Sequence, residues 1–242
     1  MSELMNLKID ERFLTRVYRS ERVVEIAEAF GIGLDEKEFV VYDGLDLPVK
    51  KGDVIYITGQ SGGGKSVLLR NLAKQFSAMP GERVVNLDQI ELDDSAALID
   101  LIGSDTTDAL RLLNAVGITD AFVYLRKPSE LSDGQRYRFR MAKAIETGAT
   151  VWCCDEFLAI LDRTSAKIIA YSLQKVARRH GATLIVATTH TDLTRDLGPD
   201  LVVNKRFREK VLVERIEEAA ARCAERTVTR EELQSWIGEF TP

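Results

Sequence analysis

A glycine-rich stretch that ends in lysine and serine is the part of this chain best suited to bind phosphate. It reads Gly-Gln-Ser-Gly-Gly-Gly-Lys-Ser over residues 59–66, after an apolar run at 54–58. Glycines let backbone N–H groups turn toward anionic oxygens, and the start of a following helix adds positive potential. Lys65 supplies a charge for the β- and γ-phosphates, and the Ser66 hydroxyl is a ligand for Mg²⁺. The residues expected to bind the nucleotide are Gly59, Ser61, Gly62, Gly63, Gly64, Lys65, Ser66 and Val67.

Two carboxylates, Asp155 and Glu156, end a second apolar run at 150–154. In a parallel sheet, the carboxyl end of a buried strand lies beside a phosphate loop of this kind. We therefore expect Asp155 to hold Mg²⁺ and Glu156 to polarise the attacking water. The alternative for this pair, taken alone, is an ordinary strand end that carries acidic residues.

Two further segments carry groups that suit a γ-phosphate. His190 follows the apolar run 183–188, and its imidazole could hydrogen-bond to that phosphate; a structural histidine is the alternative. Ser132 and Gly134 lie in Leu-Ser-Asp-Gly-Gln, residues 131–135, where a helix start would make a second anion site. One chain rarely needs two such sites. Two chains arranged head to tail, each completing the other's pocket, would use both.

The elements that position these residues alternate along the chain. Short apolar runs at 54–58, 84–87, 150–154 and 183–188 predict buried parallel strands, and helical patterns lie between them. Residues 21–58 look like strands and turns, with strands at 23–26, 39–42 and 45–49. Residues 95–147 predict a helical insertion with breaks near Gly103, Gly117 and Pro128. A helix capped by Thr164 is expected to reach about His180.

The composition indicates a globular protein with one sizeable core. The 242 residues are 45% hydrophobic and carry a net charge of −5, which does not suggest a non-specific nucleic-acid coat. No apolar run is long enough to cross a bilayer, and the N-terminus lacks the pattern of a secretory signal. Cys153, Cys154 and Cys223 form no metal-binding pattern, so reduced thiols and a cytoplasmic location are expected.

Taken in order, these motifs resemble the ATP-binding cassette (ABC) family of ATPases over about residues 21–206. The resemblance implies an α/β fold: a P-loop NTPase of ABC type with a mostly parallel central sheet, an N-terminal antiparallel β portion and a compact helical insertion. It implies that Ser132 and Gly134 contact the γ-phosphate bound to the opposite subunit. Asp155 and Glu156 match the Walker B aspartate and the catalytic glutamate, and His190 matches the switch histidine.

The resemblance also assigns residues that physics alone does not. Asp162 belongs to a segment like the D-loop, which crosses the dimer interface, and Gln89 matches the Q-loop glutamine that touches Mg²⁺ and water. Phe30 aligns with the aromatic residue that stacks on adenine; a core role, or Phe39 or Tyr42 in its place, are the alternatives. The expected catalytic residues are Lys65, Gln89, Glu156 and His190, and the expected Mg²⁺ ligands are Ser66, Gln89 and Asp155.

Some features depart from the family pattern. Asp133 stands where the family usually has glycine, so a compensating cation from Arg136 or Arg138 is expected. The spacing from Lys65 to Gln89, 24 residues (89 − 65), is short beside transporter ATPases. We expect a single domain, 1–242, divided into a β and phosphate-loop half (21–90), a helical insertion (91–148), a Walker B and switch half (149–206) and a C-terminal tail (207–242).

The particular residues in these motifs resemble those of a soluble branch of the family that is often fused to an acetyltransferase-fold domain. We therefore expect an ATP hydrolase that binds ATP and Mg²⁺ as a homodimer and drives a separate soluble partner, such as an acetyltransferase-fold protein, in nucleic-acid metabolism or modification. One alternative is the ATP-binding subunit of a membrane transporter, docked on a membrane subunit. Another is an ATP-dependent dimerisation switch with little hydrolysis. The basic run 136–140 invites a nucleic-acid interpretation, but a solvated helix face is favoured.

Overall fold

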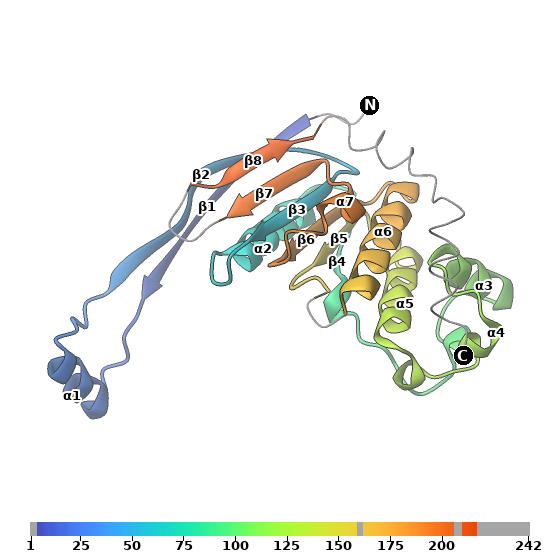
Figure 1. Ribbon diagram of the computed structural model, residues 1–242, viewed down its shortest axis with the longest axis horizontal. Coiled ribbons are helices and arrows are strands. Elements are labelled where there is room, and N and C mark those ends of the chain that lie inside the picture. The colour runs from blue at the N-terminus through green and yellow to red at the C-terminus, as the bar shows by residue number, and fades with distance from the viewer. Residues whose placement is uncertain (1–3, 159–161, 206–209, 217–242) are drawn as a thin grey trace.

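The computed structural model describes residues 4–158, 162–205 and 210–216. Within these residues a six-stranded sheet has the order β4-β5-β6-β3-β7-β8 (Figure 1). Neighbouring strands are parallel from β4 to β7, and only β8 runs antiparallel to its neighbour. The mostly parallel sheet expected from the sequence is thus confirmed. Its strands are β3 (Val54–Gly59), β4 (Val84–Asn86), β5 (Val151–Cys154), β6 (Thr183–Thr188), β7 (Leu201–Lys205) and β8 (Leu212–Arg215).

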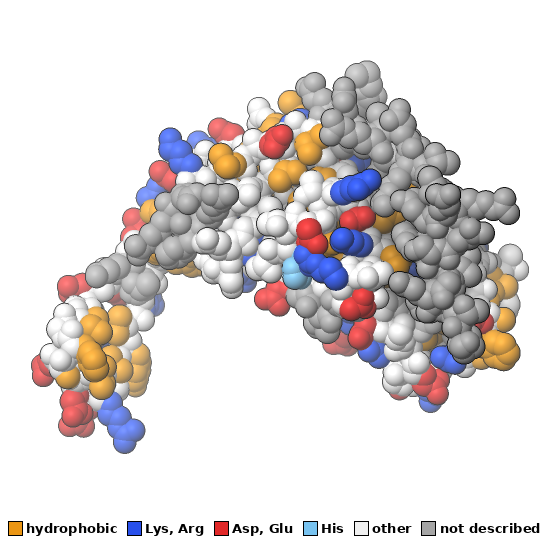
Figure 2. Space-filling model, in the orientation of Figure 1, with side chains coloured by type: hydrophobic (Ala, Val, Ile, Leu, Met, Phe, Trp, Pro, Cys, Tyr) orange, Lys and Arg blue, Asp and Glu red, His pale blue; other side chains and the backbone are white. Residues whose placement is uncertain are grey.

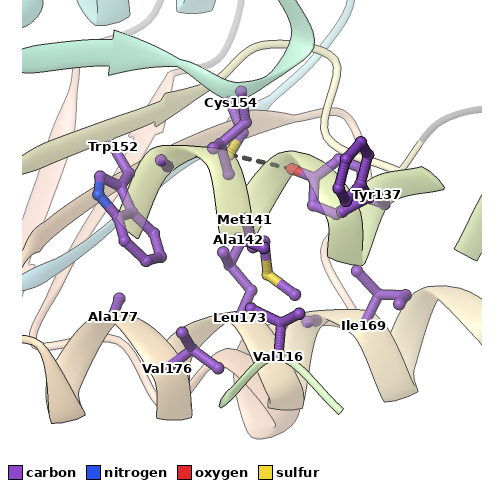
Figure 3. Packing of buried hydrophobic residues seen from close by; sticks show 14 of the residues in the cluster. Val116, Tyr137, Met141, Ala142, Trp152, Cys154, Ile169, Leu173, Val176 and Ala177 are labelled. Carbon is purple, nitrogen blue, oxygen red and sulfur yellow. Dashed lines mark hydrogen bonds between the residues drawn. The ribbon is translucent and has the colours of Figure 1, made fainter. Parts of the chain in front are cut away.

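Helices cover both faces of this sheet. Side chains such as Tyr56 and Trp152 pack toward α5 (Asp133–Glu146) and α6 (Arg163–Arg179), as Figure 3 shows for part of this core. Their sequence neighbours Ile55 and Cys153 pack on the other face, in a cluster with side chains of α2 (Lys65–Ser77). Because both faces are buried, the strands show continuous apolar runs rather than alternation.

The helical insertion lies between β4 and β5, as the sequence predicts. It contains α3 (Thr106–Ala115), α4 (Ala121–Tyr124) and the 3₁₀ turns η1 (Leu87–Gln89), η2 (Leu98–Asp100) and η3 (Pro128–Glu130). The expected breaks fall where the helices end or begin. Gly103 precedes α3, Gly117 follows it, and Pro128 opens η3. The remaining short helix, α7 (Thr194–Leu197), follows β6.

An antiparallel pair, β1 (Leu4–Thr15) and β2 (Lys37–Lys50), precedes the sheet, so the expected antiparallel N-terminal portion is confirmed. Leu7, Ile9, Leu47 and Val49 of this pair are buried in the cluster that includes α2. The outer part of the pair leaves the body, with helix α1 (Glu21–Phe30) at its tip (Figure 1). We call residues 13–40 the arm.

The arm corrects one expectation: residues 23–26, expected as a strand, lie inside α1. Ser20 caps this helix, because its hydroxyl accepts a hydrogen bond from the Val23 N–H at 3.3 Å. Gly31, at φ 62°, ends it in the left-handed region. The two caps outweigh the strand preference of the β-branched residues between them. The strands expected at 39–42 and 45–49 are both parts of β2.

The arm also exposes apolar side chains. Most of the exposed large hydrophobic residues in the described chain lie between Phe13 and Val40, including Tyr18, Ile26 and Phe30. Figure 2 shows hydrophobic side chains gathered over the tip of the arm. Within the described residues, no second layer covers the two-stranded ribbon there.

The cap of α6 is a second correction. Asp162, rather than Thr164, caps this helix: its carboxylate accepts hydrogen bonds from the N–H groups of Thr164 at 3.1 Å and Ser165 at 3.0 Å. The helix ends at Arg179 with His180 as its C-cap, close to the end expected at about His180.

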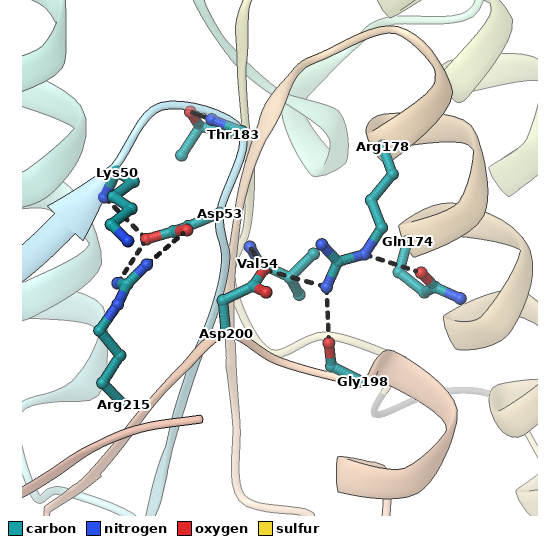
Figure 4. A network of polar contacts seen from close by, with 10 residues as sticks. Lys50, Asp53, Val54, Gln174, Arg178, Thr183, Gly198, Asp200 and Arg215 are labelled. Carbon is teal, nitrogen blue, oxygen red and sulfur yellow. Dashed lines mark hydrogen bonds and ion pairs between the residues drawn. The ribbon is translucent and has the colours of Figure 1, made fainter. Parts of the chain in front are cut away.

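A polar network anchors the amino end of β3 (Figure 4). The Arg215 guanidinium donates two hydrogen bonds to the Asp53 carboxylate, at 2.8 and 3.1 Å. Asp200 accepts from the Val54 N–H at 2.8 Å and pairs with Arg178 at 2.9 Å. These contacts hold the end of the sheet opposite to the phosphate loop.

Two remaining expectations concern membranes and the tail. Of the helices in the described parts of the chain, none is long and apolar enough to cross a membrane. Most of the expected tail, residues 217–242, lies outside the described residues.

Candidate nucleotide-binding site

The loop between β3 and α2 needs glycine at two positions for packing reasons. Gly59 has φ 140°, and a Cβ there would lie 1.8 Å from the Lys205 carbonyl oxygen. Gly64 has φ 95°, and a Cβ there would lie 2.6 Å from Cγ1 of Val41. The loop is therefore pressed between the backbone of β7 and a side chain of β2, in a conformation that L residues rarely adopt.

Lys65 lies against this loop. Its ammonium group donates a hydrogen bond to the Gln60 carbonyl at 2.8 Å, and only 9% of the residue is exposed. Burial lowers the pKa of Lys65, and the nearby charges of Asp155 and Glu156 oppose that shift. The lysine is thus held at the first turn of α2, close to both carboxylates.

The two strongest candidates for Mg²⁺ ligands meet directly. The Ser66 hydroxyl donates to Oδ1 of Asp155 at 2.9 Å, although 89 positions separate the two residues in the sequence. A hydroxyl and a carboxylate are hard oxygen ligands of the kind that Mg²⁺ takes when substrate phosphates and water complete its shell. This donor set fits the expected ion.

Glu156 follows in an unusual backbone conformation, with φ 47°. Its N–H donates to Oδ1 of Asp155 at 3.0 Å, and the next residue, Phe157, donates its N–H to the Ala187 carbonyl at 2.9 Å. Such a conformation costs about 1–3 kcal/mol in a residue other than glycine and persists only where neighbouring contacts impose it. We call residues 155–157 the catalytic turn.

One cavity of about 460 Å³ joins these groups. This volume is in the range of small-molecule sites. Its walls come from the phosphate loop, the first turn of α2, the catalytic turn and the end of β6. The lining residues are Ser61, Gly62, Gly64, Lys65, Ser66, Val67, Asp155, Glu156, Ala187, Thr188 and Thr189.

The aromatic candidates are placed differently from the expectation. Phe30 is at the end of α1, 73% exposed, and the arm carries it away from the phosphate loop (Figure 1). Tyr42 is buried, and its hydroxyl donates to the Gly64 carbonyl at 3.1 Å, so it holds the end of the phosphate loop. Within one chain, the structure does not bring Phe30 to the cavity.

Phe13 is an aromatic residue that sequence reasoning missed. It lies opposite Phe39 in the β1–β2 pair and lines a hollow of about 210 Å³. Val67 lines both this hollow and the main cavity, so the two adjoin. The alternation of Leu7 and Ile9 along β1 was the signal that could have placed this strand beside α2.

Ser132 and Gly134 lie at the start of α5. Ser132 is its N-cap: its hydroxyl accepts from the Gln135 N–H at 3.3 Å, and Gln135 accepts from the Ser132 N–H at 3.0 Å. Ser132 is exposed, and neither residue is among the described residues that line the cavity. Arg136 forms an ion pair with Asp133, which places the expected compensating cation. A role for Ser132 toward a second copy stays a prediction.

Of the remaining candidates, His190 and Gln89 lie next to residues that contact the catalytic turn, and within the described residues Asp162 does not. The His190 N–H donates to the Thr188 hydroxyl at 3.2 Å, and its carbonyl accepts from the Tyr56 hydroxyl. His190 is therefore held just past the cavity wall at the end of β6. Gln89 ends η1, one residue after Asp88, whose carboxylate contacts the Asp155 N–H. Asp162 serves as the cap of α6, next to residues outside the described chain.

Comparisons with known proteins agree with this geometry. A family model described as ABC transporter matches residues 42–159. The methionine import ATP-binding protein MetN 1 of Oceanobacillus iheyensis is 30% identical over 196 residues, which cover 67% of this chain and 57% of that protein. A methionine import ATP-binding protein of Helicobacter hepaticus is 29% identical over 192 residues, 66% of this chain and 54% of its own length. The chain thus spans little more than half the length of these curated relatives.

Solved structures show the same fold. A dimeric ATP-binding cassette bound to ADP and phosphate has a TM-score of 0.56 at 16% identity, covering 89% of this chain and 98% of its own. The cbiO1 protein of Clostridium perfringens, part of an ABC transporter complex, has a TM-score of 0.56 at 20% identity, covering 84% of this chain and 90% of its own.

These relatives correct the functional expectation. A soluble ATPase that drives a separate partner in nucleic-acid metabolism was the main prediction, and it is wrong: the relatives reported above are named as import or transporter proteins. The short spacing between Lys65 and Gln89 had weighed against a transporter. The number of residues between these two positions reflects the length of the connecting segments, and it does not identify the protein that the ATPase docks on. By its ordered motifs, its fold and its relatives, the chain belongs to the ATP-binding cassette family of ATPases.

Proposed function

We propose that this chain is the ATP-binding subunit of a membrane transporter and hydrolyses Mg-ATP between two copies at the cytoplasmic face of the membrane. The observation that carries the ATPase part is the single cavity shared by the phosphate loop, the Ser66–Asp155 contact and Glu156. The import proteins among the relatives support the transporter part.

Each residue has a role that follows from its position. The phosphate loop and Lys65 hold the β- and γ-phosphates, and Ser66 and Asp155 would hold Mg²⁺, which neutralises phosphate charge when bound. Glu156 lines the same cavity and orients the attacking water for in-line displacement. Gln89 and His190 would complete the site beside the γ-phosphate. Lys65 stabilises negative charge as it develops on the transferring group.

The nucleotide base has a place beside the phosphates. Phe13 lines the adjoining hollow together with Val67 and Arg70. The Phe13 ring offers an aromatic face in a hollow that adjoins the main cavity, which suits stacking on a purine base. We therefore assign the stacking role to Phe13, in place of Phe30.

A second copy would complete the site. Ser132 is exposed at the N-terminus of α5, a 14-residue helix whose positive end can face an anion. Since this end lies outside the cavity of its own chain, the γ-phosphate it serves would belong to the opposite copy. The homodimer is therefore part of the proposal.

The helical insertion offers a surface for the membrane subunit. Phe122 and Leu125, in and just after α4, are 75% and 71% exposed. Two large apolar side chains exposed three positions apart in the chain are a candidate interaction surface.

Two experiments test the proposal. Glu156→Gln should retain ATP and lose turnover by about 100-fold or more, and light scattering should show a dimer only with Mg-ATP. Undiminished hydrolysis in this variant would remove Glu156 from its role.

For the transporter part, the wild-type chain should co-purify with a polytopic membrane protein, and the double variant Phe122→Ser, Leu125→Ser should not. Leu212→Ser, at an exposed apolar position of β8, is a matched surface control; equal capture by all three proteins would contradict the docking surface.

A further inference from the structure

The 3₁₀ turn η1 carries a carboxylate that the proposed mechanism does not use. Asn86 caps this turn by accepting a hydrogen bond from the Asp88 N–H at 3.0 Å. The turn directs the Asp88 side chain toward the end of β5. There its Oδ2 accepts a hydrogen bond from the Asp155 N–H at 2.8 Å. Asp88 immediately precedes Gln89, so this contact links the Gln89 turn to the catalytic turn.

The catalytic turn needs support at this point. The positive φ of Glu156 would relax if its neighbours released it. On its far side the turn is held by Phe157, whose N–H donates to Ala187 and whose carbonyl accepts from the Thr188 hydroxyl at 3.2 Å. On its near side, the backbone contact at Asp155 is made by Asp88.

The signature helix α5 reaches the same junction. Arg140 donates to the Ile90 carbonyl at 3.3 Å, just after Gln89. Tyr137, one turn earlier, contacts the Cys154 sulfur at 3.1 Å and packs edge-on against Phe157, with ring centroids 5.9 Å apart. Side chains of α5 thus contact Phe157 at one end of the catalytic turn, Cys154 just before the turn, and Ile90 just after Gln89.

We propose that Asp88 is a positioning residue, which through the Asp155 N–H makes the Gln89 turn and the catalytic turn move as one unit. Arg140 ties α5, and with it Ser132, to this unit. The inference rests on the proposed ATPase function and adds to it: a displacement of the Gln89 turn or of α5 would shift Glu156 relative to the attacking water. An error of about 1 Å in such a position can lower a rate by about 100-fold.

The test compares Asp88→Ala, which removes the acceptor, with Asp88→Asn, which keeps an acceptor oxygen. Asp93→Asn is the matched control, because the Asp93 carboxylate accepts hydrogen bonds from Ser95 within its own loop. For Asp88→Ala we expect kcat to fall about 10- to 100-fold with KM for ATP within about twofold of wild type. Asp88→Asn should recover most of the rate, and the control should match wild type. Arg140→Gln probes the junction from α5 and should lower kcat less than Asp88→Ala.

Hydrogen exchange gives a readout that does not need turnover. In the full chain, the peptide covering residues 151–158 should exchange faster in Asp88→Ala but not in Asp88→Asn or Asp93→Asn. Unchanged exchange in Asp88→Ala would overturn the inference, and so would faster exchange with an unchanged kcat. If Asp88→Ala does not fold, an unchanged rate in Arg140→Gln overturns it instead. A wild-type chain that does not hydrolyse ATP would contradict the proposed function, while the exchange result would still decide whether Asp88 holds the turn.

Discussion

The nucleotide site and the arm differ in what surrounds their strands and helices. β3 is covered on both faces, and Val54, Ile55, Tyr56 and Ile57 are fully buried. Among the strands that the structure describes, β1 and β2 of the arm pair only with each other, and Leu14, Tyr18 and Phe39 are exposed. The strained backbone at Glu156, with φ 47°, occurs in the covered region, where packed neighbours can impose it. Burial on both faces of the sheet therefore allows this chain to hold reactive groups in fixed positions.

The largest expected loss of stability comes from a substitution at Gly59, in the covered region. Gly59→Ala would place a methyl group against the Lys205 carbonyl oxygen, in a backbone conformation unfavourable for alanine. We expect a loss of roughly 4 kcal/mol or more in the free energy of unfolding, measured by urea denaturation. Gly62→Ala is the control: its φ of 72° is also positive, but no described atom lies within 4 Å of the added methyl. Equal losses in both variants would mean that backbone strain, and not the clash, dominates.

Truncating one isoleucine in each region compares them directly. Ile57 is fully buried, so Ile57→Ala should lower the free energy of unfolding by about 2–5 kcal/mol. Ile26 on α1 is 55% exposed, so Ile26→Ala should change it by no more than about 0.5 kcal/mol. Both are measured by urea denaturation. A large loss at Ile26 would show that the arm is packed against something in solution.

Removing the charge of the phosphate loop should affect binding more than folding. We expect Lys65→Ala to weaken ATP binding by about 10- to 100-fold, in a titration with a fluorescent ATP analogue, because one charge-assisted contact is lost. Lys175→Ala, on α6 and outside both the main cavity and the adjoining hollow, should bind as wild type does. Unchanged affinity in Lys65→Ala would separate the lysine from the phosphates.

The smallest effect concerns the cap of α6. Hydrogen bonds from Ser165 and Thr164 lower the pKa of Asp162. A carboxylate whose folded pKa is depressed stabilises the protein above its unfolded pKa of about 3.9, and this contribution is lost as the pH falls through the folded value. Asp162→Asn should therefore lower the melting temperature slightly at pH 7, and the difference from wild type should shrink in acid. A difference that is constant with pH would contradict this account.

The sequence predicted the secondary structure around the nucleotide site better than that of the arm. Around the site it predicted strands 54–58 and 183–188, helix α2 and the helical insertion, because those segments combine continuous apolar runs with glycine and proline breaks. It missed helix α1, whose two valines suggested a strand, and it named Thr164 instead of Asp162 as a cap. In both cases a hydrogen bond between one side chain and a nearby backbone N–H decided the structure, and local pattern does not show which bond forms.

The candidate site shows the same division. The sequence alone determined which residues could bind phosphate, hold a divalent ion and orient water, because those roles depend on residue type and local spacing. Only the tertiary structure brought Ser66 to Asp155, placed Phe13 instead of Phe30 in a hollow that adjoins the main cavity, and joined Asp88 to the catalytic turn. Those contacts connect residues far apart in the chain. They follow from the order in which the strands pair and the way helices cover them, and no short segment of sequence carries that information.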